Sequence, residues 1–240
     1  MTTASQPAYR PFRERRFLQL LCLAMAVIIV VTGYRPERVF DWWLENAAAL
    51  TFLAVLGITY RRLPLSDLSY LLIFVYLSLH EWGAEYKYSD VPLGEWMKPW
   101  LHTTRNHYDR VMHFSYGLLL SYPMQEWFMR TVGVTSRWRY LLPVEMTLSF
   151  SACYEMLEAF AASVLTPERG EEFVGMQGDI WDSQKDMFMA GCGAITAMLV
   201  IAVVRTILSR RKEAELQAAV AVAVYTAAAT RPDISRNDRT

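Results

Sequence analysis

Cysteine is scarce in this sequence, and its scarcity excludes two kinds of architecture. The 240-residue chain holds three cysteines, Cys22, Cys153 and Cys192, and none of them has the Cys-x-x-Cys spacing of a thiolate metal site. Each falls within an apolar stretch, where a free cysteine behaves as a small apolar side chain. The sequence therefore predicts neither a disulfide framework nor a metal site built from thiolates.

The chain also lacks an excess of charge of either sign. Lys and Arg together number 24, as do Asp and Glu, so the formal net charge is zero. Nothing in this balance indicates a nucleic-acid partner, which usually calls for a basic excess. Hydrophobic residues, in contrast, make up 53% of the chain, and they occur in blocks.

The apolar blocks have the lengths of membrane spans. Uncharged runs cover residues 17–33, 46–60 and 187–204, which reach or approach one bilayer crossing. Residues 64–86, 108–130 and 138–162 are also apolar but interrupted by charge, with Trp and Tyr at their flanks as at a membrane interface. Because an open sheet cannot satisfy its backbone in lipid, the pattern predicts an all-α integral membrane protein, a six-transmembrane-helix bundle.

The basic residues of the short connections predict the orientation. With the N-terminus inside, the cytoplasmic side carries twelve Lys and Arg residues and the opposite side six. By the positive-inside rule both termini are then cytoplasmic. We expect a cytoplasmic segment at 1–16, the membrane domain at 17–209, and a cytoplasmic, partly disordered tail at 210–240, whose alanine-rich run is too short to span a bilayer.

Ionisable residues gather near the outer ends of four predicted spans. At 1.5 Å per residue, His80 lies roughly 22 Å along its span from the inner end, in the outer third of the bilayer, and the other groups fall near the same level. Spacings of three or four residues put the members of each group on one helix face, except for His80 and Glu81, which are neighbours in the sequence. The groups are His80 with Glu81, Asp109 with His113, Glu155 with Glu158, and Asp179 with Asp182 and Asp186.

Carboxylates at membrane depth need a compensating charge. Each charged side chain costs roughly 2.5 to 3.5 kcal/mol at a helix centre on insertion scales. A divalent cation, protonation, or pairing with Arg110 and Lys185 would compensate them. Imidazole with carboxylate suits Zn²⁺, Mn²⁺ or Fe²⁺, so one hypothesis is a single divalent metal ion. Its candidate ligands are His80, Asp109, His113, Asp182 and Asp186.

The same groups suggest a reaction. Glu155 and Glu158 are candidate catalytic bases for a water bound to the metal. Candidate substrate-binding residues are Tyr86, Arg105, His107 and Arg110, of which the arginines suit a phosphate or carboxylate. We therefore expect a metal-dependent hydrolase or transferase that acts on a lipid-linked or other amphiphilic small molecule.

Two other functions stay open. The acids could carry a proton or an ion through a transporter, or they could hold the helices together in a structural or accessory membrane protein. In the latter, the connection at 86–107 would be a docking surface. Its Trp96 and Trp100 also suit a membrane-surface segment or a lid, and Pro92 and Pro99 argue against one uninterrupted helix there.

Two patterns predict packing rather than chemistry. Glu126 and Glu145 lie toward the cytoplasmic ends of their spans, where we expect pairing with Arg130 and Arg137. The stretch MAGCGAITA carries small residues four apart, which favours close helix packing. The glycines of GMQGD are expected to allow a tight turn into the last span, with Asp179 as its helix cap.

Four sequence blocks resemble the YjdF-like family of bacterial inner-membrane proteins: HEWGAEYKYSDVP (80–92), RNHYDRVMHFSYG (105–117), SACYEMLEAFAA (151–162) and GMQGDIWDSQKDMFMAGCGA (175–194). The likeness covers most of residues 65–207 and implies a helical, multi-pass protein of the bacterial inner membrane. It implies no activity, because the function of that family is unknown. The residues that match the family's pattern are His80, Tyr86, Tyr88, Pro92, His107, Tyr108, Asp109, Arg110, His113, Glu155, Glu158, Gln177, Asp179, Trp181, Asp182 and Asp186.

Overall fold

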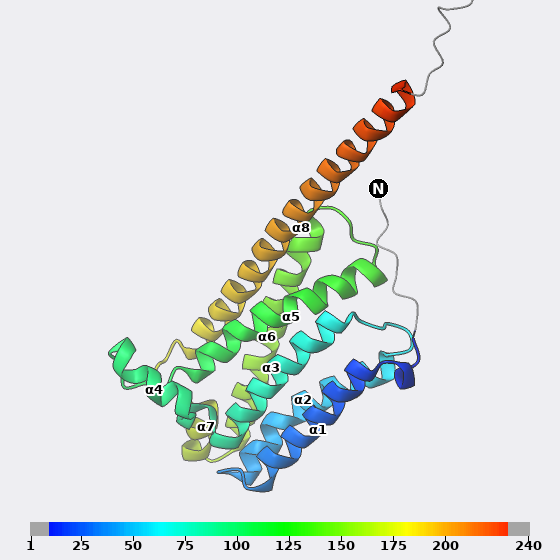
Figure 1. The fold of residues 1–240 in the computed structure, drawn as a ribbon. Coiled ribbons are helices and arrows are strands. Elements are labelled where there is room, and N and C mark those ends of the chain that lie inside the picture. The colour runs from blue at the N-terminus through cyan, green and yellow to red at the C-terminus, as the bar shows by residue number, and fades with distance from the viewer. Residues whose placement is uncertain (1–9, 230–240) are drawn as a thin grey trace, which may run out of the picture. The chain divides into compact units, whose positions relative to one another are not determined.

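The fold is helical throughout the part of the chain that the structure describes. The structure is a computed structural model, and it describes residues 10–229 (Figure 1). The α-helices are α1 (Arg16–Tyr34), α2 (Val39–Thr59), α3 (Asp67–Tyr86), α4 (Pro92–Leu101), α5 (Tyr108–Thr131), α6 (Trp138–Val164), α7 (Pro167–Val174) and α8 (Asp182–Ala229), with 3-10 turns η1 (Phe12–Glu14) and η2 (Tyr88–Asp90). The all-α prediction is confirmed, and each predicted span coincides with a long helix.

Within residues 10–229, three helices are long and apolar enough to cross a membrane: α1, α2 and the Asp182–Ala223 part of α8. On α1, Leu20, Leu23 and Val30 are 63%, 63% and 69% exposed, as expected for side chains that face lipid. Helices α3, α5 and α6 have 20, 24 and 27 residues. They are long enough for a span, but they carry the polar groups described below.

The chain forms two compact units, Met1–Met198 and Leu199–Thr240. The first contains the bundle and the beginning of α8. The second contains the remainder of α8, which stays helical through the alanine-rich run as far as Ala229. The predicted disordered end of the tail, and most of the predicted 1–16 segment, lie outside the described residues.

The connection at 86–107 is not one continuous helix, as its prolines predict. It forms η2 and then the ten-residue α4. Pro92 begins α4 at a position where a missing N–H costs nothing. Pro99, however, lies inside the helix, so only the first of the two prolines marks a helix boundary.

Glu126 ties one end of the bundle together. Its carboxylate accepts hydrogen bonds from the Ser66 backbone N–H (2.9 Å) and hydroxyl (2.9 Å) and from the Ser69 hydroxyl, all at the start of α3. It also pairs with Arg130 one turn along α5, so that predicted pair is confirmed. Glu145 is an exposed residue of α6.

Helices α5 and α8 meet at backbone distance. A Cβ on Gly117 of α5 would lie 2.0 Å from the carbonyl oxygen of Ala190, and a Cβ on Gly193 of α8 would lie 2.1 Å from that of Phe114. Ala190 and Ala194 have no exposed surface. The predicted close packing through small residues is confirmed, and it brings the first turns of α8 against the first turns of α5.

This close approach makes Gly117 sensitive to a single added methyl group. We expect Gly117→Ala to lower the unfolding temperature in detergent, because overpacking costs about 1–3 kcal/mol and the atom in the way is backbone. Gly57→Ala is the matched control, since a Cβ on Gly57 of α2 meets nothing within 4 Å. Equal unfolding temperatures for the two variants would contradict the α5–α8 contact.

Candidate functional site

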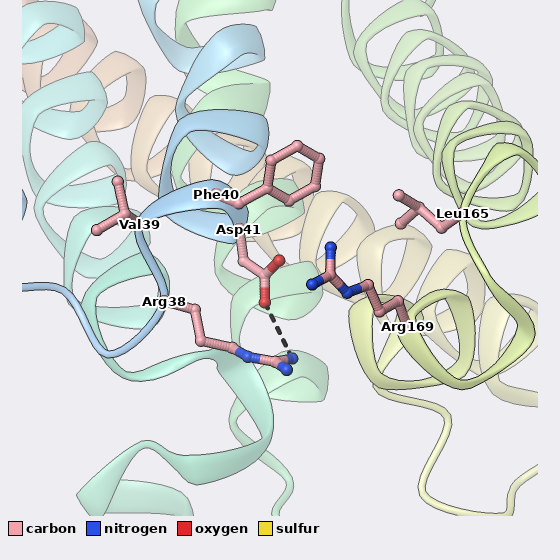
Figure 2. Close-up of a pocket in the computed structure, with 6 residues that line it drawn as sticks. All are labelled: Arg38, Val39, Phe40, Asp41, Leu165 and Arg169. Atoms are coloured by element: carbon pink, nitrogen blue, oxygen red, sulfur yellow. Dashed lines mark hydrogen bonds and ion pairs between the residues drawn. The ribbon is translucent and has the colours of Figure 1, made fainter.

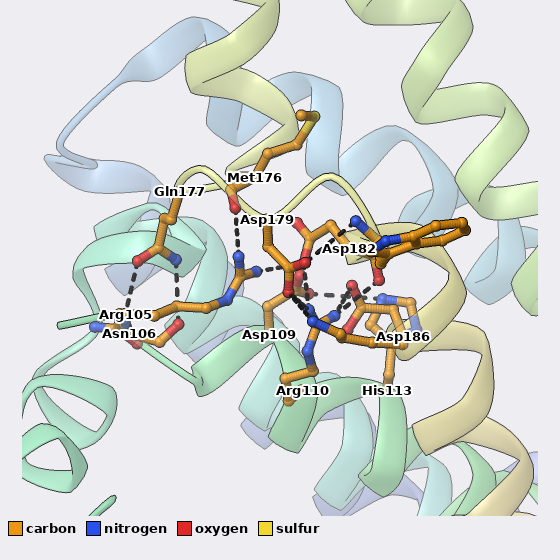
Figure 3. Close-up of polar contacts among 12 residues, drawn as sticks. Arg105, Asn106, Asp109, Arg110, His113, Met176, Gln177, Asp179, Asp182 and Asp186 are labelled. Carbon is orange, nitrogen blue, oxygen red and sulfur yellow. Dashed lines mark hydrogen bonds and ion pairs between the residues drawn. The ribbon is translucent and has the colours of Figure 1, made fainter. Parts of the chain in front are cut away.

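Two arginines converge on one aspartate where the starts of α5 and α8 meet (Figure 3). The guanidinium groups of Arg105 and Arg110 each lie 2.5 Å from Oδ1 of Asp182. Arg110 also donates to the backbone carbonyl of Asp182 at 2.9 Å. All three side chains are buried, with 10%, 10% and 5% of their surfaces exposed, so the charges stabilise one another away from water.

Arg110 holds two more aspartates. It pairs with Oδ2 of Asp186, one turn along α8, and lies 3.2 Å from Oδ2 of Asp179. Asp179 also accepts a hydrogen bond from Lys185 at 2.6 Å, and this contact lowers the pKa of the Asp179 carboxyl. We call Arg105, Arg110, Asp179, Asp182 and Asp186 the arginine–aspartate cluster.

Asp179 belongs to a turn rather than to the helix. Helix α8 begins at Asp182, and Oδ1 of Asp179 accepts the backbone N–H of Trp181 at 3.1 Å within the preceding turn. Gly175 and Gly178 there have positive φ angles, which glycine adopts without strain, and Gln177 between them has a φ of 48°. The predicted tight turn is confirmed, and Asp179 reaches Arg110 from outside the helix.

The loop before α5 and the turn before α8 are joined by side chains. Arg105 donates to the Met176 carbonyl. Gln177 and Asn106 bond reciprocally, with the Asn106 N–H donating at 2.9 Å and the Gln177 amide donating to the Asn106 carbonyl at 3.1 Å. Figure 3 shows these contacts beside the arginine–aspartate cluster. Together they hold the two segments in register at this end of the bundle.

A second group of side chains lies directly against the cluster. One ligand atom each from Asp109, His113 and Asp186 fall within 4.8 Å of one another. We call these three residues the cation-ligand set. Asp186 is 2% exposed, and its buried Oδ1 has no hydrogen-bond partner among the residues that the structure describes. Glu155 adjoins the set, with Oε1 3.4 Å from Nε2 of His113 and likewise without a hydrogen bond.

The charges of this region do not balance. The acids are Asp109, Asp179, Asp182, Asp186 and Glu155, and the cations in contact with them are Arg105, Arg110 and Lys185. If all were ionised, two negative charges would remain. Burial makes such an excess costly, so the arrangement can accept a cation or protons.

The structure brings together some of the predicted ligands and separates others. Asp109, His113 and Asp186 form the cation-ligand set, whereas Asp182 lies between the two arginines. His80 is buried at the end of α3, where its Nδ1 lies 2.5 Å from the Tyr88 hydroxyl.

The remaining candidates lie around this region. Glu158 is half-buried on α6, three residues beyond Glu155. Tyr86 ends α3 and is 36% exposed. His107 is the N-cap of α5, and burial, followed by the charges of Arg105 and Arg110, lowers the pKa of its imidazole.

One polar pair, Glu45 and Tyr154, is not predicted by the sequence pattern. Glu45 of α2 accepts a hydrogen bond from the Tyr154 hydroxyl of α6 at 2.9 Å, and it interacts electrostatically with Asp109. The uncharged run begins only at residue 46 and so does not include Glu45, although α2 starts at Val39. The four-residue spacing of Asp41 and Glu45 was the available clue.

A small pocket lies one helical turn from Glu45, at the start of α2. It has a volume of about 170 Å³ and opens between the beginning of α2 and the corner that joins α6 to α7 (Figure 2). Its polar lining consists of Arg38, Asp41 and Arg169, with Arg38 and Asp41 paired at 3.4 Å. The structure therefore has a small open space beside the start of α2, next to the residues around Glu45.

The two arginines make Asp182 the most sensitive carboxylate of the site. We expect Asp182→Asn to destabilise the protein by about 3–5 kcal/mol, because buried positive charges lose their partner. Asp67→Asn is the control, since Asp67 pairs with Arg15 but is 61% exposed and an exposed pair contributes about 0–1 kcal/mol. Thermal unfolding in detergent compares them, and a similar loss in both would argue against the buried cluster.

Comparison with known proteins agrees with this architecture. A family model described as "Predicted membrane protein (DUF2238)" matches residues 17–207. The inner membrane protein YjdF of Escherichia coli (strain K12) is 34% identical over 186 residues, which cover 77% of this chain and 88% of that protein. No solved structure matches the chain. The chain therefore belongs to the DUF2238 family of predicted membrane proteins, the YjdF-like family that its polar motifs resemble.

Proposed function

We propose that the chain is a multi-pass inner-membrane protein with six spans. Its cation-ligand set holds one divalent metal ion near the non-cytoplasmic face of the inner membrane. The six spans are α1, α2, α3, α5, α6 and the membrane part of α8, with both termini cytoplasmic. One contact supports the alternation of the first three spans: the starts of α1 and α3 meet through Arg15 and Asp67. The name of the YjdF relative supports the inner membrane.

The unpartnered oxygen of Asp186 is the observation that carries the cation site. A buried carboxylate oxygen without a hydrogen bond is costly, and it belongs to a carboxylate that offers a ligand atom within 4.8 Å of those of Asp109 and His113. The donor set fits Zn²⁺, Mn²⁺ or Fe²⁺, which accept imidazole and carboxylate together. A bound dication would also offset the excess negative charge.

The residues around the set suit hydrolysis or group transfer. A divalent ion would lower the pKa of a bound water and polarise a substrate oxygen. Glu155 is 7% exposed, and its free Oε1 is positioned beside His113 to accept a proton. Arg105 and Arg110 are bonded to aspartates, so in this proposal they fix the start of α8 rather than bind the substrate. The expected substrate is amphiphilic, because the site adjoins the membrane interface.

Metal content tests the proposal directly. We expect detergent-purified protein, supplemented with Zn²⁺, Mn²⁺ or Fe²⁺ and then desalted, to retain a near-stoichiometric ion by mass spectrometry. Asp186→Asn and His113→Ala should lose it, because each removes one ligand. His102→Asn is the control: His102 is exposed outside the set and has a φ of 50°, a conformation that asparagine tolerates. Folded wild type without metal would overturn the proposal.

A buried polar line between α5 and α6 favours proton-coupled transport as a second candidate. Ser121 and Thr147 are fully buried, and their hydroxyls lie 3.2 Å apart. Ser151 is 2% exposed, and its hydroxyl is unpartnered. The line follows four-residue spacings from the site toward the opposite end: Glu155, Ser151 and Thr147 on α6, and His113, Ser121 and Gln125 on α5, where Gly117 interrupts the polar side chains.

Proton flux separates this candidate from a metal enzyme. If the line conducts, proteoliposomes loaded with a pH-sensitive dye should acidify under an imposed voltage, and Glu155→Gln should abolish the change because it removes the exchangeable proton. Ser163→Ala is the control, since Ser163 lies exposed on the same helix. Wild-type flux equal to that of empty liposomes would exclude the transport function.

A further inference from the structure

An apolar groove lies beside the arginine–aspartate cluster, between α4, α5 and the first turns of α8. Its volume is about 360 Å³, within the range of about 300–1,000 Å³ that small-molecule sites occupy. Phe188 is 68% exposed and Leu101 51% exposed, so the groove is open to its surroundings. Its apolar lining consists of Met97, Leu101, Val111, Phe188 and Met189.

The groove lining also contains two basic side chains, Arg110 and Lys185, which we call its basic end. His107 lines the groove as well, but the pKa of its imidazole is lowered. Arg110 is held by the cluster, but the Lys185 side chain is 54% exposed and its ammonium group has three donors, one of which Asp179 accepts. The same Arg110 guanidinium contacts Asp186 of the cation-ligand set. The basic end is therefore one side chain away from the proposed metal ion.

Helix α4 forms a fixed wall of this groove. Asn106 donates to the Val91 carbonyl (3.1 Å) and to Glu95 (2.8 Å), which ties α4 to the start of α5. A Cβ on Gly94 would lie 1.6 Å from the Asn106 side-chain oxygen, so the two segments are in direct contact. The outer face of α4 exposes 63% of Trp96 and 72% of Trp100.

These tryptophans place the groove at the membrane interface. Amphipathic aromatic side chains concentrate at that level of a bilayer, and a short helix that exposes two of them suits an interfacial position. A hydrocarbon chain could then enter the groove directly from the lipid, while an anionic group at its end would meet Lys185. Apolar wall, basic end and interfacial position thus describe one kind of ligand.

We propose that the groove binds a hydrocarbon chain of a membrane lipid with a phosphate-containing head group, and that the head group lies at Lys185. This deepens the proposed function, on which it rests for the reaction, by naming the substrate class. The phosphate would then be presented to the cation-ligand set.

Photo-cross-linking tests the groove. The probe is phosphatidic acid with a diazirine in its acyl chain, reconstituted with the full-length protein in phosphatidylethanolamine vesicles, and the diacylglycerol with the same acyl chain is the uncharged comparison. We expect cross-links in the peptides that contain Met97 to Leu101 and Phe188 to Met189. Val111→Trp should reduce them several-fold by filling the groove, whereas Leu157→Trp, at a residue 64% exposed on α6, should not.

The charge of the head group is tested by Lys185→Gln. This change should reduce labelling by phosphatidic acid several-fold and leave labelling by diacylglycerol unchanged, because only the phosphate interacts with the ammonium group. Equal labelling of all helices, or no effect of Val111→Trp in a folded protein, would overturn the proposal.

Metal content of the same samples keeps the two proposals apart. Bound metal without groove-specific labelling would overturn the lipid site and leave the cation site standing. Groove-specific labelling without bound metal would support the lipid site and overturn the metal-dependent reaction.

Discussion

The carboxylate of Asp182, held between the guanidinium groups of Arg105 and Arg110, is the contact on which the rest of the polar site depends. It joins the loop before α5, the first turn of α5 and the first residue of α8. Buried ion pairs of this kind contribute little net stability compared with apolar packing, but breaking one is costly. Its effect is therefore on specificity: it fixes the register in which α8 begins against α5.

Close packing below this contact sets the distances of the site. Gly117 and Gly193 let the backbones of α5 and α8 touch. A larger side chain at either position would separate the two helices and move Asp186 away from Asp109 and His113. In lipid, where apolar surfaces gain nothing by leaving one apolar medium for another, small residues and interhelical hydrogen bonds drive such association. The polar cluster above and the small residues below thus depend on each other.

The sequence could predict the helices, but not which polar groups meet. Hydropathy locates spans because lipid requires apolar runs, and residue spacing places Asp109 and His113 on one face. Depth along a helix, however, does not give direction around it. His80 lies near the level of His113, yet its Nδ1 faces Tyr88 on η2. Glu45 was missed because an uncharged run does not mark the true start of α2.

Asp186 belongs to both groups of residues, and this sharing couples them. Its Oδ2 pairs with Arg110 while its Oδ1 stays unpartnered beside the cation-ligand set. A cation bound to this carboxylate would share its charge with the guanidinium, so each would weaken the other's hold on it. The aspartates around Arg110 limit this competition, because Arg110 keeps Asp182 and Asp179 as partners. The surplus acids therefore give the site room for a cation without releasing α8 from α5.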